Sequence, residues 1–361
     1  MSNTTLVKIV NCIEPFYNGA KDWDSPEETI ERFLAFAKDS TVEGMMDFSV
    51  LRHGEWSLGE PLLKEGLLDF IRDKSGDAGV LWVGDSGLGK EAPKRAYITS
   101  SNDSARDIMA KYFAARAEAL FHIRGNAPNG IAVVDSPMRR NLLNLSSVDL
   151  DMGLGYFADT IARAIKYAPD AGVIYTPKIL TRRNLFEGAT DIVYTTEQAV
   201  AVVNESIYKL GNFYSEKPLL RVMGRLLTKV YEFFSGNHHQ ERVNASVNSS
   251  AAYWSEPSET VEQAFNQIPE GLRSYLFHVQ SPVGGPPGHN NRGEFKGDGF
   301  YDMSRDVGFI VGLARQGHPV QICADTSPEY FNKRGIRTTE ERLKQIGNGN
   351  NYLKELLETV K

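Results

Sequence analysis

The chain has 361 residues, of which 41% are hydrophobic and 24% are charged, and it carries a formal net charge of −6. Two cysteines far apart, Cys12 and Cys323, exclude a disulfide-rich scaffold and indicate a reducing compartment. The polar N-terminus does not resemble a signal peptide and no apolar run approaches a membrane span, so we expect a cytoplasmic protein without a membrane partner. The acidic net charge argues against general nucleic-acid affinity but still allows local basic loops.

Short strands and amphipathic helices are expected in the first half of the chain. Ser25 is a favourable N-cap for a helix that begins at Pro26, because acidic residues follow in its first turn. Ser104 is likewise expected to cap a helix. The expected strands cover residues 5–12, 78–83, 131–134 and 172–176, and the expected helices lie within 26–38, 55–73, 104–121 and 157–167.

The second half of the chain contains longer apolar segments. Residues 191–210 are rich in Val, Tyr, Thr and Ile, which predicts long strands, with a helix around 198–203 as the alternative. Residues 219–234 have apolar side chains at three- and four-residue spacing, which predicts a buried helix that ends at Gly236. The other expected elements are a strand within 245–254, a Gly/Pro-rich loop at 284–299, a helix over 302–315 that ends at Gly317, a strand at 318–324, and short helices at 339–346 and 352–360.

The sequence GDSGLGK at 84–90 matches the phosphate-binding pattern GxxxxGK after a strand. Such a loop cradles phosphates with backbone N–H groups, and Asp135 imitates the aspartate that holds magnesium in these enzymes. However, Glu91 stands where a Ser or Thr should ligate magnesium, and Pro93 stands where the following helix should begin. We therefore keep a degenerate P-loop NTPase as a weaker alternative.

Two arginine pairs in predicted loops are candidates for contacts to a phosphate backbone. A solvated surface is the simpler explanation of either pair alone, but the polar loop after the 219–234 helix and a small-residue turn before an early helix strengthen the binding interpretation. The candidate RNA-binding residues are Ser57, Lys64, Arg139, Arg140, Arg182, Arg183, Gly236, Asn237, His238, His239, Gln240 and Arg242.

No motif in the sequence indicates catalysis or a bound metal. His238 and His239 are adjacent in a loop, so they point in different directions, and they lack the HxxxH or HExxH spacing of metal ligands. A Ser-His-Asp order, a GxSxG turn, a paired-carboxylate motif and a dinucleotide fingerprint are also missing from the sequence. We therefore expect no metal, no cofactor and no enzyme activity.

Taken in order, these pieces resemble the backbone subunit of the type I CRISPR Cascade complex, in the RAMP superfamily. The resemblance covers most of the chain as an order of elements, without a single specific motif. A helix that ends in a Ser-Gly loop at 230–236 and the β-rich segment 191–210 carry it most directly. The segments 57–70, 104–121, 302–315, 320–324 and 339–346 follow the same order. Asn237-His238-His239 departs from the family, which has more glycine there.

The resemblance implies an α+β fold with an RRM-like antiparallel sheet as a palm and with inserted helical, thumb and finger elements. It implies one body over 1–361, a thumb near 172–190 and an inserted loop at 284–299. The implied function in antiviral defence is that of a non-catalytic subunit that self-assembles along a CRISPR guide RNA, which it holds through sugar and phosphate while the guide base-pairs with target nucleic acid. Its partners would be the RNA, copies of itself and other effector subunits. A viral or phage capsid or nucleocapsid protein is the main alternative.

Overall fold

The structure is a computed structural model, and it describes residues 7–13, 25–47, 65–75, 80–84, 101–124, 131–135, 138–140, 147–169, 174–178, 189–191, 193, 195–213, 243–249, 252, 259–279, 303–324, 331–332 and 335–359. Within these residues, eight strands pair side by side, all parallel, and close into a barrel in the order β1-β10-β9-β8-β6-β4-β3-β2. The barrel strands are β1 (Val7–Cys12), β2 (Glu43–Asp47), β3 (Val80–Gly84), β4 (Ile131–Asp135), β6 (Ile174–Lys178), β8 (Ala245–Asn248), β9 (Arg273–Val279) and β10 (Val320–Ala324).

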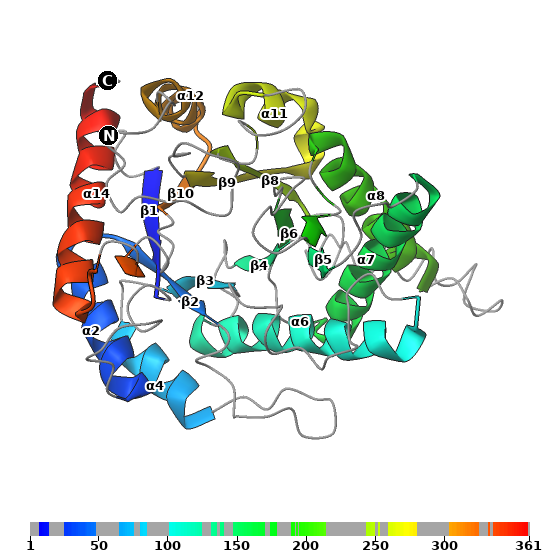
Figure 1. Cartoon of the computed structure of the whole chain (residues 1–361), viewed down its shortest axis with the longest axis horizontal. Helices are drawn as coiled ribbons and strands as arrows, with labels where there is room; N and C mark the ends of the chain where they lie inside the picture. The colour runs from blue at the N-terminus through cyan, green and yellow to red at the C-terminus, as the bar shows by residue number, and fades with distance from the viewer. Residues whose placement is uncertain are drawn as a thin grey trace.

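Every barrel strand is followed along the chain by an α-helix, and the helices form a ring outside the strands (Figure 1). These helices are α2 (Pro26–Asp39), α4 (Glu65–Ser75), α6 (Asp103–Arg124), α7 (Ser147–Tyr167), α8 (Thr196–Phe213), α11 (Val261–Gln267), α12 (Met303–Arg315) and α14 (Thr339–Thr359). A closed parallel barrel inside a ring of helices is the (β/α)8 or TIM-barrel fold. A search of the described helices finds none that is both long and apolar enough to cross a membrane.

The main hydrophobic core lies between the outer face of the barrel and the helices. On β9, Phe277 packs against Phe265 of α11 and Phe309 of α12, with ring centroids 5.5 and 6.4 Å apart. Because successive side chains of a strand point to opposite faces, the neighbours of Phe277 on β9 face the inside of the barrel. The same alternation therefore separates a helix-facing side from a barrel-facing side on each strand.

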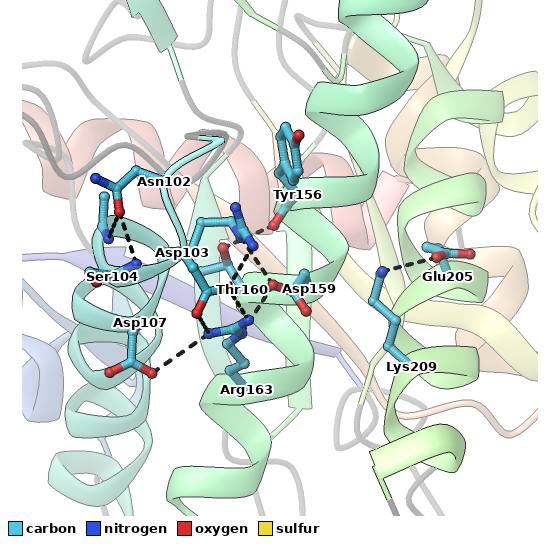
Figure 2. Close-up of polar contacts among 12 residues, drawn as sticks. Asn102, Asp103, Ser104, Asp107, Tyr156, Asp159, Thr160, Arg163, Glu205 and Lys209 are labelled. Atoms are coloured by element: carbon cyan, nitrogen blue, oxygen red, sulfur yellow. Dashed lines mark hydrogen bonds and ion pairs between the residues drawn. The ribbon is translucent and has the colours of Figure 1, made fainter. Parts of the chain in front are cut away.

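Local signals in the sequence are partly confirmed. The Ser25 hydroxyl accepts a hydrogen bond from the Glu28 N–H at 3.2 Å, so it caps α2 as predicted. Helix α12 ends before Gly317, which has a φ of +94°. The cap of α6 is Asn102 instead of Ser104, because the Asn102 side-chain oxygen accepts from the Ser104 N–H at 3.0 Å (Figure 2). The expected short helices at the C-terminal end are one continuous helix, α14.

The expected RRM-like antiparallel sheet is wrong, because the eight barrel strands pair in parallel. The decisive error is the preference for strands at 191–210, a segment rich in Val, Tyr, Thr and Ile; the alternative of a helix around 198–203 is confirmed by α8. These residues fall mostly in α8, whose Val202 and Val203 are buried against the rest of the core. Tertiary burial thus outweighs the weak β propensity of these side chains. With α8 read as strands, the regular alternation of strand and helix could not be seen.

Other expected elements fall in different places in the structure. The barrel strand β6 lies in the region expected to be a thumb. Met138–Arg140 forms a short strand, β5, that pairs antiparallel with β7 (Ala189–Asp191) in a separate two-stranded sheet, so Arg139 and Arg140 are not in a loop. The expected helix at 219–234, the loop at 284–299 and residues 85–90 of the glycine-rich sequence lie outside the described residues. The organisation as a single body stays a prediction.

A buried pair of asparagines joins β1 to α14. The Asn350 amide donates to the Asn11 side-chain oxygen at 2.7 Å, and the Asn11 amide donates to the Asn350 oxygen at 3.2 Å and to the Ala324 carbonyl at 3.3 Å. Both asparagines are 1% exposed. Since Ala324 belongs to β10, this cluster ties the first strand to the last strand and to the last helix, where the barrel closes.

We expect Asn350→Ala to lower the free energy of unfolding by about 1–3 kcal/mol, because it leaves the buried Asn11 amide short of partners. Urea denaturation measures this change. The control is Asn351→Ala, an exposed position next in the same helix, which carries the same gain in helix propensity and should change stability by less than about 0.5 kcal/mol. Equal effects of the two substitutions would contradict a role for the buried pair.

Helices α6 and α7 are held together by a network of charges (Figure 2). Arg163 of α7 donates to the Asp103 carboxylate of α6 at 2.6 and 3.2 Å, and it forms an ion pair with Asp159 at 3.0 Å. Arg106 of α6 bonds the same two carboxylates, Asp103 at 2.8 Å and Asp159 at 3.0 Å. Its guanidinium also lies over the ring of Tyr156, 4.6 Å from the centroid. Two arginines and two aspartates therefore alternate across the helix interface.

The pKa of Asp103 is lowered, chiefly because Arg163 hydrogen-bonds its charged form and secondly because Arg163 and Arg106 attract it. A lowered pKa in the folded state means that the stabilisation is present above the ordinary aspartate pKa and is lost as pH falls through the folded-state value. We expect Arg163→Gln to raise the pKa of Asp103 toward its ordinary value, as measured by NMR titration of its carboxyl carbon. Arg305→Gln on the distant helix α12 is the control. An unchanged Asp103 pKa in Arg163→Gln would contradict the assignment.

Candidate functional site

The carboxyl ends of the barrel strands meet at one end of the barrel. In TIM-barrel enzymes the reacting groups sit at this end, because the loops that leave it are free to vary while the barrel stays rigid. His278, the next-to-last residue of β9, lies at this end and is 1% exposed. Because its neighbour Phe277 packs outward on the helices, His278 faces the inside of the barrel.

His278 is flanked on both neighbouring strands. Asn248 of β8 stands beside it in register, and Cys323 of β10 stands beside it on the other side. Asn248 is 1% exposed and Cys323 is 0% exposed, and both share the inward face, since register partners in a sheet point to the same side. An imidazole, an amide and a thiol thus form one buried row across three strands.

A second polar position lies next to this row. Ser246 precedes Asn248 by two residues on β8, so it shares the inward face, and it is fully buried. Its register partner is Lys178, the last residue of β6, which pairs in turn with Asp135, the last residue of β4. Residues with polar or ionisable side chains therefore occupy neighbouring register positions from β4 to β10 at the carboxyl end.

The inward face of β8, β9 and β10 is polar along much of its length. Its buried polar members are Ser246, Asn248, Ser274, His278 and Gln321. Barrel interiors of this fold are dominated by Val, Ile and Leu, which pack without hydrogen-bonding needs. Buried polar side chains need hydrogen-bond partners, so this sector of the barrel differs in chemistry from an apolar packed interior.

The donor set of the described residues does not make a metal site. A search of these residues for three or more His, Cys, Asp or Glu side chains that converge on one point finds none. His278 has an amide on one side and a single thiol on the other.

The residues predicted to bind RNA are not brought together in the described structure. Arg139 and Arg140 lie in β5, outside the barrel, beside Thr190 and Ala189 of β7. The other predicted residues, namely Ser57, Lys64, Arg182, Arg183, Gly236, Asn237, His238, His239, Gln240 and Arg242, lie outside the described residues. Their role in binding a ligand stays a prediction.

The sequence analysis missed His278, Asn248, Ser246 and the position of Cys323 beside the histidine. A signal for them exists: each is a polar or reactive residue inside or at the end of a short apolar run, as in LFHV at 276–279. That signal gains meaning only when the runs are known to be parallel strands, because only then do their carboxyl ends share one edge.

Comparison with known proteins supports the fold. No protein-family model and no curated protein matches the chain. Among solved structures, D-psicose 3-epimerase with D-tagatose from Clostridium cellulolyticum H10 matches 97% of this chain and 99% of its own with a TM-score of 0.59 and 10% identity. L-ribulose 3-epimerase matches 98% and 95% with a TM-score of 0.60 and 12% identity. The IOLI protein with a binding zinc atom matches 98% and 99% with a TM-score of 0.58 and 10% identity.

These similarities overturn the resemblance to the Cascade backbone and the RAMP superfamily. This chain is a parallel barrel and two of these neighbours are sugar epimerases. The guide-RNA, target and effector-subunit partners therefore have no support, and neither do the capsid and NTPase alternatives. The expectation of a non-catalytic protein, which followed from the missing catalytic motifs and from the same resemblance, is overturned as well, because the neighbours named as epimerases are enzymes. At 10–12% identity, what the chain shares with these proteins is the TIM-barrel fold.

Proposed function

We propose that this protein is an enzyme that moves a proton on a carbon next to the carbonyl group of a small polyhydroxylated ketone, as a sugar epimerase or isomerase does. The observation that carries the proposal is His278, a buried imidazole inside the barrel at its carboxyl end, in register with Asn248 and Cys323. The structural neighbours that act on ketoses support the substrate class.

The proposed reaction needs a group that accepts and returns a proton near neutral pH. Histidine suits this task because its ordinary pKa of about 6.5 lies close to the working pH. His278 would remove the proton from the carbon beside the carbonyl, and the electron pair of the broken C–H bond would move to the carbonyl oxygen to give an enediolate. The Asn248 amide, beside His278, is placed to donate a hydrogen bond to an oxygen that becomes negative.

Return of the proton completes the reaction without a net change in electrons or atoms. Return to the other face of the same carbon gives an epimer, and return to the adjacent carbon gives an isomer. Epimerisation needs a second group across the substrate. In the eight-stranded order, β3 lies opposite β9, and the flanking strands β2 and β4 end in Asp47 and Asp135. The second proton carrier would therefore come from this side of the barrel.

The proposal predicts that the purified protein exchanges a ketose C–H proton for deuterium. D-fructose, D-tagatose and D-allulose in D2O would be followed by proton NMR, which detects loss of the C3 proton signal whether or not an epimer accumulates. We expect His278→Gln to slow exchange by about 10²–10⁴-fold, the usual contribution of a general base. Sugar binding should be retained, because the substitution removes the proton carrier and keeps a polar side chain.

The matched control is His122→Gln. His122 lies on α6, outside the barrel, where its ring nitrogen bonds Asp69 at 2.8 Å. This control should exchange the sugar proton at the wild-type rate. Full exchange activity in folded His278→Gln protein would exclude His278 as the base, and absence of exchange for every ketose with wild-type protein would overturn the proposed reaction.

A further inference from the structure

The Ser246 side chain lacks a hydrogen-bond partner in the described part of the chain, although it is fully buried. Most buried polar side-chain atoms in proteins have at least one partner, and a buried hydroxyl without one costs free energy. Two other buried hydroxyls among the described residues follow the rule. Ser206 donates to the Val202 carbonyl at 2.7 Å, and Thr160 donates to the Tyr156 carbonyl at 2.9 Å.

The difference follows from the element that carries each residue. A serine hydroxyl in a helix can donate to the carbonyl four residues earlier, so the hydroxyl of Ser206 has a partner within its own helix. A serine in a strand points away from the sheet, where its own backbone carbonyls are already engaged in the plane. Ser246 can therefore be satisfied only by something that lies on the inner face of the barrel.

The direction of the Ser246 side chain is set by its neighbours on β8. Ala245 and Val247 are the register partners of Arg273 and Phe277, which contact Phe265 of α11 on the outside. The pairing of β8 with β9 shifts register between Ala245 and Val247, but the shift is two residues of β9, so each residue stays on the same face. Ser246, between them, therefore faces inward on the same side as Asn248. The spacing of a strand puts these two residues about 6.6 Å apart, which is close to the length of an extended open-chain hexose.

Other unpartnered buried oxygens in the described residues have different surroundings. Glu43 Oε2 lies on the first residue of β2, at the amino end of the barrel, and its partner atom Oε1 bonds Lys8 at 2.8 Å. Gln345 Oε1 lies on α14, outside the barrel. Ser246 thus combines an unpartnered hydroxyl with a place inside the barrel beside the proposed catalytic row.

We infer that Ser246 is a ligand-binding residue that hydrogen-bonds a hydroxyl group of a neutral polyhydroxylated substrate, further along the carbon chain from the carbon that faces His278. The inference rests on the proposed function for the substrate class. A hydroxyl is the fitting partner because it can both donate and accept, as the serine hydroxyl can. The ordered ligand would remove the cost that the free protein bears at this position.

The test is Ser246→Ala. If the inference holds, this substitution weakens sugar binding but does not lower the stability of the free protein. Binding of D-fructose, D-tagatose, D-allulose and D-sorbitol would be measured by titration calorimetry, D-sorbitol being an alditol that binds without reacting. We expect the dissociation constant of the bound sugars to rise about 3- to 10-fold, the usual effect of one lost hydrogen bond. The Tm of the free protein should stay the same or rise, because an unsatisfied hydroxyl is removed.

Ser206→Ala is the matched control, since it makes the same substitution at an equally buried serine whose hydroxyl is bonded. It should lower the Tm and leave the dissociation constants unchanged. Ser246→Ala with unchanged dissociation constants, or with a Tm lowered as in the control, would overturn the inference. Sugars that bind without proton exchange would overturn the proposed reaction and leave the subsite standing. Wild-type protein that binds none of the probes would overturn both.

Discussion

The parallel pairing of β1 with β10, which closes the barrel, is the constraint on which the rest of the structure depends. Once the first and last strands meet, every strand has a neighbour on both sides and one face turned toward the helices. That outer face must be apolar to hold the helices, as the contacts among Phe265, Phe277 and Phe309 show. The Asn11–Asn350 pair reinforces the closure with buried hydrogen bonds whose partners are themselves satisfied.

Closure of the barrel also gives the two faces of each strand different roles. Because the helices supply the main apolar core, the inner face near the carboxyl end is free to carry polar groups. Asn248, His278 and Cys323 use this freedom, and Ser246 extends the polar surface toward Lys178 at the end of β6. The alternating charges between α6 and α7 keep two neighbouring helices in a fixed relation outside the barrel (Figure 2). Rigid support outside and polar groups inside together favour a site for a small polar substrate.

The candidate site could not be predicted from sequence in the way that the elements could. His278 is a single histidine in an apolar run and has no partner at a fixed sequence spacing, so local sequence does not mark it as a site residue. Its partners, Asn248 and Cys323, are 30 and 45 residues away and come from different strands. The histidines that were singled out, His238 and His239, were noticed because they are adjacent in sequence. Adjacent residues seldom aim at one point, whereas residues on neighbouring strands in register do.

The sequence by itself determined much of the local structure. The cap at Ser25, the helix end at Gly317 and most barrel strands follow from side-chain period and backbone preference over a few residues. The tertiary structure alone decided that the strands are parallel, that 196–213 is a helix and not the preferred strands, and that one end of the barrel gathers the polar residues. The reason is sequence separation. The Asn11 amide bonds the Ala324 carbonyl, which is 313 residues away in the chain, and no local pattern predicts which distant strand will be the neighbour.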